Sequence, residues 1–248
     1  MKRILFLIGA LLLALPALAQ TLVVAVDSSL AAAMPAVARS FEASRPGVRV
    51  TLITGAAGAL LEQVARDTRA DVLAGTDAET VALGVQRKLL VPDLRSAFAA
   101  NTLVLVVPVS LNLPVRRLSD LARPEVVRIA MGRQASVPAG RYAREAINAQ
   151  RLWPSVQRKV VFADDETAVL KLVADADVEA GFVYSTSAAA APAGRVRVVE
   201  TLPTTTPIRY QANVIIGSTQ AAMAAEFVAH LRSDVARVEF QRLGFGLP

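Results

Sequence analysis

Short apolar segments alternate with longer, helically spaced segments along most of the chain. Three such pairs fill the first third, at residues 21–26 and 29–44, 48–54 and 58–67, and 70–75 and 77–87. Strands of near-continuous Val, Leu and Ile that each lead into a helix are typical of parallel βαβ units, whose strands are buried on both faces. The first third is therefore predicted to form one α/β unit.

A second series of the same kind follows the apolar run at 101–109. Its strand-like segments are 126–132, 160–163, 179–184 and 195–202, and its helical segments are 118–125, 138–150, 165–176 and 185–191. After one more strand-like run at 207–217, the apolar positions of residues 220–245 follow a helical period. We expect this closing helical segment to pack back on the first unit.

A return to the first unit requires two connections between the units, near residues 102–108 and 207–214. The pattern therefore predicts an α/β protein with two lobes joined by a two-segment hinge. Residues 20–103 and 211–248 would form lobe 1, and residues 104–210 would form lobe 2.

The first 19 residues are typical of an export signal. Lys2 and Arg3 precede an apolar run from Ile4 to Leu15, and residues 17–19 are small enough for cleavage before Gln20. The run is shorter than the roughly 20 residues of a spanning helix. We therefore expect residues 1–19 to be removed as a signal peptide and the protein to be periplasmic. The chain has no cysteine, so we expect no lipid-modified cysteine, disulfide or thiol chemistry.

Composition and charge narrow the class of partner. Hydrophobic residues make up 54% of the chain, which is enough for a packed core. Without the leader, 25 basic residues stand against 21 acidic ones, a net charge of +4, and the arginines are scattered without interleaved aromatic residues. This pattern is typical of solvated faces. We expect a monomer with no nucleic-acid partner.

The sequence lacks the common catalytic, nucleotide and metal motifs. It has no G-x-S-x-G nucleophile motif, P-loop, dinucleotide motif or EF-hand. The single histidine, His230, lies beside charged positions of the closing helical segment, which favours a structural role. The acids at 164–166 fall at a predicted helix start, where capping explains them. We therefore expect no enzyme, no cofactor and no metal ligand.

Small and hydroxyl residues recur where a predicted strand meets a helix. Ser28 and Ser29 follow the first strand, residues 55–58 (GAAG) follow the second, and residues 136–140 (SVPAG) and 184–185 (YS) do so in the second lobe. A helix start carries about four unpaired N–H groups and a partial positive charge, which an anion can reach past small side chains. Capping explains any one such turn. Four turns from two lobes predict a site for a small oxyanion.

With these segments in this order, the sequence resembles the periplasmic molybdate-binding proteins of ABC transporters, which are type II periplasmic binding proteins. The segments that carry the resemblance are VAVDSSLAAAMPAVARSFE, GALLEQVARDTRADVLAGTD, VPAGRYAREA, AVLKLVADADVEAGFVYSTSA and FQRLGF. The resemblance implies the two-lobed type II fold. It also implies capture of molybdate or tungstate in the cleft between the lobes and delivery to an ABC permease at the inner membrane.

The resemblance further implies the residues that hold the oxyanion. Ser29 would contact it from the first turn, and Ala57 would occupy the second binding position. From the other lobe, Ala139 and Glu166 would donate their backbone N–H groups, and Tyr184 would donate its hydroxyl.

Three positions depart from the family pattern. Ala57 stands where a serine is common, Glu166 where an apolar residue is usual, and Asp27 where a small apolar residue is usual. A carboxylate repels a nearby dianion unless it points away or pairs with an arginine such as Arg133 or Arg141.

These acids leave other functions open. The same fold could bind a solute with a cationic group, or a larger organic molecule. A secreted hydrolase that uses Ser28 or Ser29 is a further alternative, although no partner base is evident. The effector domain of a transcription regulator shares the architecture, but the export signal disfavours it.

Overall fold

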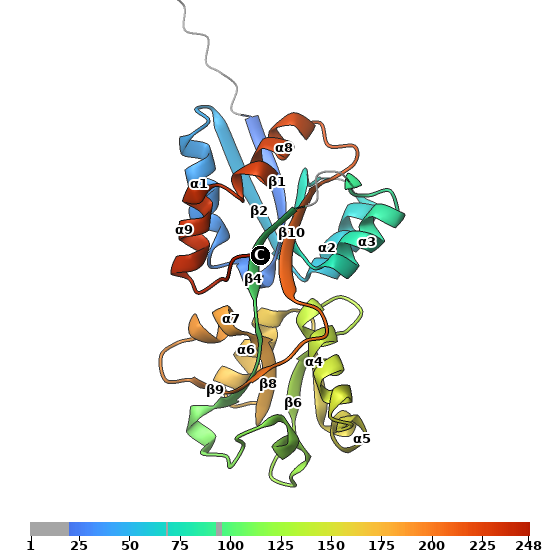
Figure 1. The fold of residues 1–248 in the computed structure, drawn as a ribbon, viewed down its shortest axis with the longest axis vertical. Helices are drawn as coiled ribbons and strands as arrows, with labels where there is room; N and C mark the ends of the chain where they lie inside the picture. Colours follow the sequence, from blue (N-terminus) through green and yellow to red (C-terminus); the bar gives the residue numbers. More distant parts are fainter. Residues whose placement is uncertain (1–19, 68, 93–95) are drawn as a thin grey trace, which may run out of the picture.

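The structure is a computed structural model that describes residues 20–67, 69–92 and 96–248. The expected signal peptide, residues 1–19, lies outside the described residues. Two lobes are stacked along the long axis of the molecule (Figure 1), each built on one five-stranded sheet. The strand orders are β2-β1-β3-β10-β4 in lobe 1 and β7-β6-β8-β5-β9 in lobe 2. The predicted two-lobed α/β fold is confirmed.

Lobe 1 combines the first third of the chain with its end. Its strands are β1 (Gln20–Asp27), β2 (Val48–Gly55), β3 (Val72–Thr76), β4 (Ser96–Asn101) and β10 (Ile208–Val214). Its helices are η1 (Ser28–Leu30), α1 (Met34–Ala43), α2 (Ala57–Arg66), α3 (Ala78–Gln86), α8 (Ala221–His230) and α9 (Asp234–Arg242). The strands β2, β1 and β3 are parallel, as the βαβ pattern predicts, whereas β10 runs antiparallel to both β3 and β4.

Lobe 2 is a continuous piece of chain. Its strands are β5 (Leu103–Pro108), β6 (Ile129–Gly132), β7 (Val160–Ala163), β8 (Ala180–Tyr184) and β9 (Val196–Leu202). Its helices are η3 (Val109–Leu111), η4 (Leu118–Ala122), α4 (Pro138–Ala149), α5 (Trp153–Val156), η5 (Gln157–Lys159), α6 (Glu166–Ala174) and α7 (Ser185–Ala189). The strands β7, β6 and β8 are parallel, and β5 is antiparallel to β8 and β9.

The chain crosses between the lobes twice, at places that lie side by side in Figure 1. At the first crossing β4 ends at Asn101, and β5, which fills most of the apolar run at 101–109, begins at Leu103 in the other sheet. The second crossing is the segment 203–207 between β9 and β10. We propose these two places as the lobe boundaries, and the limits 103/104 and 210/211 remain sequence predictions.

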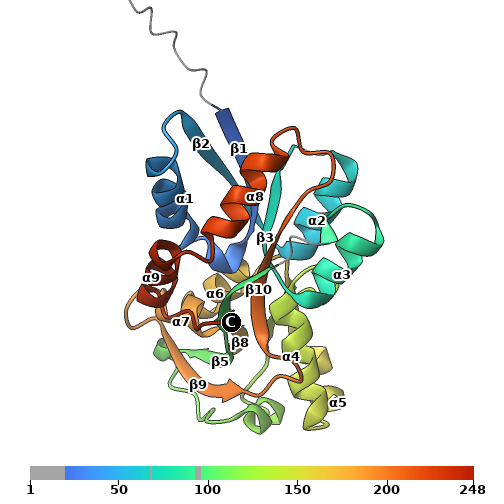
Figure 2. The same cartoon turned by 45° about the horizontal axis from the view of Figure 1, so that its top comes forward.

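The closing helical segment packs back on lobe 1, as expected (Figure 2). The Phe227 ring of α8 meets Phe41 of α1 with centroids 5.2 Å apart, and Phe240 of α9 meets Phe98 of β4 at 5.2 Å. The segment is two helices rather than one, because Ser233 caps a new helix by accepting from the N–H of Ala236. These contacts close the core of lobe 1.

Candidate functional site

Asp27 lies at the point where the first two strand-to-helix turns of lobe 1 meet. Its Oδ1 accepts from the N–H of Ser29 at 3.1 Å and from the Ser29 hydroxyl at 2.5 Å. Its Oδ2 accepts from the N–H of Ala57, the first residue of α2, at 3.0 Å. The carboxylate is buried and caps η1. One negatively charged group therefore joins two of the residues predicted to bind an oxyanion.

Glu166 plays the same part in lobe 2. It begins α6, and its side chain turns inward and is 2% exposed. Its Oε1 accepts from the N–H of Tyr184 at the end of β8, and its Oε2 accepts from the Ser187 hydroxyl at 3.1 Å. The side chain of Glu166 thus contacts the turn after β8, whereas the resemblance implied only a backbone role for this residue.

The two carboxylates lie in opposite lobes, and the charge of Asp27 acts on Glu166. Burial raises the pKa of Asp27 to about 6 and the pKa of Glu166 to about 8. The charge of Asp27 adds to the rise at Glu166, while the donated hydrogen bonds oppose it. At neutral pH the pair therefore carries less charge than two ordinary acids.

No arginine of the described residues forms a salt bridge with either acid. Arg133 pairs with Asp164 at 2.6 Å, and Arg141 crosses the cleft to Asp77 at 2.5 Å and Glu79 at 3.0 Å. Arg133 and Arg141, the two arginines considered as partners for these acids, therefore pair with other carboxylates. The hydrogen-bond donors of the turns are what stabilise the two carboxylates.

A group of polar side chains at the hinge supports the turn after β1. The sequence pattern did not predict this group. The Tyr210 hydroxyl of β10 donates to the Ser29 hydroxyl at 3.0 Å, and Asn101 Nδ2 donates to the Tyr210 hydroxyl at 3.1 Å. Asn101 Nδ2 also lies 2.8 Å from the Thr186 hydroxyl in lobe 2. The Tyr184 ring packs edge-on against Tyr210, with centroids 5.9 Å apart. In the sequence, the only signal for this junction was that Asn101 and Tyr210 carry polar groups within strand segments.

The small residues at the start of α4 have a packing cause. A Cβ on Gly140 would lie 2.0 Å from the carbonyl oxygen of Gly132, so the helix start packs directly on the end of β6. Ala139 is buried beside it. Position 140 must be small because the end of β6 lies directly beneath it, whereas the sequence pattern had indicated the approach of an anion as the reason. The N–H role of Ala139 remains a prediction.

The lobes touch directly beside the second turn. Gly58 of α2 donates its N–H to the carbonyl oxygen of Ser136 in lobe 2 at 2.9 Å. A Cβ on Gly58 would lie 2.7 Å from the Ser136 Cα. Together with the bridge from Arg141 to Asp77, this contact means that the structure has a closed cleft.

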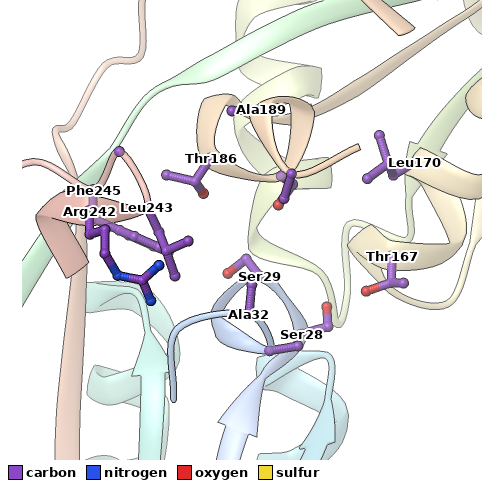
Figure 3. A pocket seen from close by; sticks show the side chains of 14 residues that line it. Ser28, Ser29, Ala32, Thr167, Leu170, Thr186, Ala189, Arg242, Leu243 and Phe245 are labelled. Atoms are coloured by element: carbon purple, nitrogen blue, oxygen red, sulfur yellow. The ribbon is translucent and has the colours of Figure 1, made fainter. Parts of the chain in front are cut away.

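A pocket of about 500 Å³ opens beside the two carboxylates, between η1, α6, α7 and the segment 242–245. Ser29 and Thr186 lie on opposite sides of it, with Thr167 and Arg242 further around (Figure 3). Ser28 also lines the pocket, and its buried hydroxyl has no hydrogen-bond partner among the described residues. The pocket is therefore mostly apolar, and its wall includes Ser29 and Ser187, whose hydroxyl groups donate to Asp27 and Glu166.

The single histidine of the chain has a hydrogen-bonding partner inside lobe 1. His230 Nε2 lies 2.8 Å from the Ser40 hydroxyl, as expected for a structural histidine. In the part of the chain that the structure describes, no three acidic, histidine or cysteine side chains are grouped so as to hold a metal ion. None of the described helices combines the length and the apolar character needed to cross a membrane.

Known proteins resemble this chain over most of its length. Residues 22–246 match the family of bacterial extracellular solute-binding proteins. A Bacillus subtilis protein described as a candidate ABC transporter substrate-binding lipoprotein, YvgL, is 30% identical over 91% of this chain and 86% of its own. The molybdate-binding protein ModA of Escherichia coli is 29% identical over 88% of this chain and 86% of its own.

Solved structures agree on the fold. The periplasmic molybdate-binding protein of Azotobacter vinelandii superposes with a TM-score of 0.77 at 19% identity, over 92% of this chain and 99% of that one. The matching family consists of proteins that bind solutes and do not transform them. The chain therefore belongs to the family of bacterial extracellular solute-binding proteins.

Proposed function

We propose that this protein is the periplasmic solute-binding component of an ABC importer, and that it captures molybdate or tungstate between its lobes for delivery to a membrane permease. One observation carries the proposal. The N–H groups of Ser29 and Ala57, from two different turns, converge on one negatively charged group at 3.1 and 3.0 Å. A place where two helix starts hold a carboxylate has the donors that an oxyanion needs.

The named relatives support this ligand class. Proteins called molybdate-binding proteins match most of the chain, including one from Haemophilus influenzae at 27% identity over 88% of this chain. We infer that Ser29, Ala57, Ala139, Glu166 and Tyr184 surround the anion. Because the lobes meet at Gly58 and Ser136, closure would exclude water and strengthen each charge-dipole contact.

Thermal unfolding of the dialysed mature protein tests the proposal. It would be measured alone and with molybdate, tungstate, sulfate, phosphate and perchlorate at matched ionic strength. A ligand at about one hundred times its dissociation constant adds roughly 2.7 kcal/mol of stability. We expect the midpoint to rise with molybdate and tungstate and to stay unchanged with sulfate. No rise with any oxyanion would contradict the proposal.

A second candidate is a solute with a cationic or N–H-rich group attached to an organic body. It is favoured by the two buried acids, which accept hydrogen bonds, and by the pocket of about 500 Å³ beside them. This candidate predicts that the oxyanion panel has no effect, while small amines and amino compounds shift the midpoint. It also predicts that loss of either acid abolishes that shift.

A further inference from the structure

Asp27 is the least expected residue of the cleft, since its carboxylate makes the contacts that a captured anion would be expected to make. It accepts three hydrogen bonds, two from Ser29 and one from Ala57. Both partners are among the predicted oxyanion ligands. An anion that enters from solution and this side chain therefore compete for the same donors.

Nothing else in the described structure commits the Asp27 carboxylate to its place. Arg141 is engaged by Asp77 and Glu79, and Arg133 by Asp164. Arg242, which lines the adjacent pocket, pairs with Glu239. The neighbouring charge that raises the pKa of Asp27 belongs to another acid, Asp77, and the charge of Asp27 itself raises the pKa of Glu166. A second anion beside these groups would be repelled, so a carboxylate and an oxyanion cannot share the position.

We propose that the position filled by the Asp27 carboxylate is an anion subsite of the cleft, and that Asp27 is its built-in occupant, which weakens the capture of an oxyanion by competing for the N–H groups of Ser29 and Ala57. The inference rests on the proposed function where it concerns the solute. The existence of the subsite does not depend on which solute is carried.

Replacement of Asp27 tests the competition. Asp27→Ala should leave the donors free, and titration calorimetry at fixed pH and ionic strength should show molybdate bound about tenfold tighter or more than by the wild type. Asp27→Asn keeps the shape of the side chain and removes its charge, so its molybdate affinity should lie between those of the wild type and Asp27→Ala. Asp27→Asn also covers the case in which the alanine variant does not fold.

A matched control uses Asp71, a buried acid of the same lobe that is not part of the cleft. It accepts from the N–H of Val23 at 2.8 Å and from the Ser218 hydroxyl at 2.7 Å. Asp71→Asn should leave the molybdate affinity unchanged. An equal gain in Asp71→Asn and Asp27→Asn would overturn the assignment to Asp27.

Formate gives a readout that does not depend on molybdate. The Asp27→Ala variant should retain a carboxylate-sized space with its donors, so formate should raise its unfolding midpoint above that in chloride of equal ionic strength. The wild type should show no such rise. If formate leaves Asp27→Ala unchanged, the subsite does not exist and the inference fails, whatever molybdate does.

The two proposals fail in different ways. If neither wild type nor variant binds any oxyanion but formate stabilises Asp27→Ala, then the proposed function is wrong and the subsite remains. If wild type binds molybdate and Asp27→Ala binds it equally or more weakly, then the proposed function stands and the competition is overturned.

Discussion

At the scale of single residues, the two inward-facing acids set the chemistry of the cleft. Asp27 and Glu166 are both buried. Asp27 accepts the N–H of Ala57 at the start of α2, and Glu166 accepts the N–H of Tyr184 at the end of β8. The hydrogen bonds keep them folded inward, while burial makes their ionised forms costly. Their protonation should therefore affect stability and binding together.

The pH dependence of stability should report Glu166. Its pKa is about 8 in the folded protein against an ordinary value of 4.5. Below pH 4.5 the group is protonated in both states. As pH rises to 8, the unfolded chain releases the proton while the folded protein retains it, so stability falls, by an amount on the order of a few kcal/mol. Asp27 acts in the same direction between its ordinary 3.8 and about 6.

Glu166→Gln should flatten that fall between about pH 6 and 8, because the amide does not titrate. Chemical unfolding at pH 5, 6, 7 and 8 would measure it. Glu200→Gln is the matched control, since Glu200 also accepts a backbone N–H, from Leu118 at 2.6 Å, but lies away from the cleft. If the unfolding free energy of Glu166→Gln falls with pH as steeply as that of the wild type, then Glu166 is not the group responsible.

The Tyr184 hydroxyl is expected to donate to the captured oxyanion. Tyr184→Phe should weaken molybdate binding roughly ten- to a hundredfold, because a hydrogen bond to a charged group contributes about 1.5–3 kcal/mol. The ring contact with Tyr210 would remain, so the unfolding midpoint without ligand should change little. Tyr142→Phe, a buried tyrosine of α4, is the control, and affinities would be compared by calorimetry. Equal affinities for Tyr184→Phe and wild type would remove Tyr184 from the site.

At the scale of elements, helix starts and strand ends from both lobes form the cleft. The start of α2 contacts the loop before α4 through the hydrogen bond from Gly58 to Ser136. The contact requires a residue without a side chain at position 58 of α2, because a Cβ there would meet the backbone of Ser136. It couples local helix geometry to the closure of the whole molecule.

Gly58→Ala should therefore hold the lobes apart without unfolding either one. The added Cβ would meet Ser136 of the other lobe at 2.7 Å, and alanine is the better helix former. We expect several-fold weaker ligand binding and a larger radius of gyration in X-ray scattering with ligand present. Gly246→Ala is the control, because its Cβ would make only an ordinary contact, 3.5 Å from Ala100. A normal radius in the liganded Gly58→Ala variant would contradict this role.

The alternation of apolar and helical segments was enough to predict most elements, because burial on both faces of a parallel strand leaves a clear pattern. It did not mark β4 (Ser96–Asn101), whose alanine-rich sequence SAFAAN lies before the apolar run at 101–109. The hydrogen bonds of Asn101 and Asp27 could not be predicted from the sequence either. They join positions 109 and 30 residues apart, to Tyr210 and Ala57 respectively, and depend on where the folded turns meet.

At the scale of the whole molecule, the ion pairs of Arg141 and two chain crossings join the lobes. Arg141 of lobe 2 is largely buried between Asp77 and Glu79 of lobe 1. Because Arg141 and its two partners belong to different lobes, these ion pairs form only when the lobes meet. They should favour the closed form whether or not they touch the solute.

Arg141→Ala should lower the affinity for ligand by increasing the open population. Single-molecule energy transfer between labels on the two lobes would show the shift, and calorimetry would give the affinity. Arg133→Ala is the control, since its partner Asp164 belongs to the same lobe and the pair is exposed. An unchanged distance distribution in Arg141→Ala would show that the bridge does not hold the lobes together.

The position of β10 has a consequence for how the chain is made. This strand lies between β3 and β4 in the lobe 1 sheet, and it is followed only by the two closing helices. Lobe 1 therefore cannot be completed until β10 has been synthesised. Lobe 2, a continuous segment from Leu103 to Leu202, can fold earlier. The molecule should assemble from its middle outward, with unpaired edges of β3 and β4 exposed to chaperones until β10 arrives.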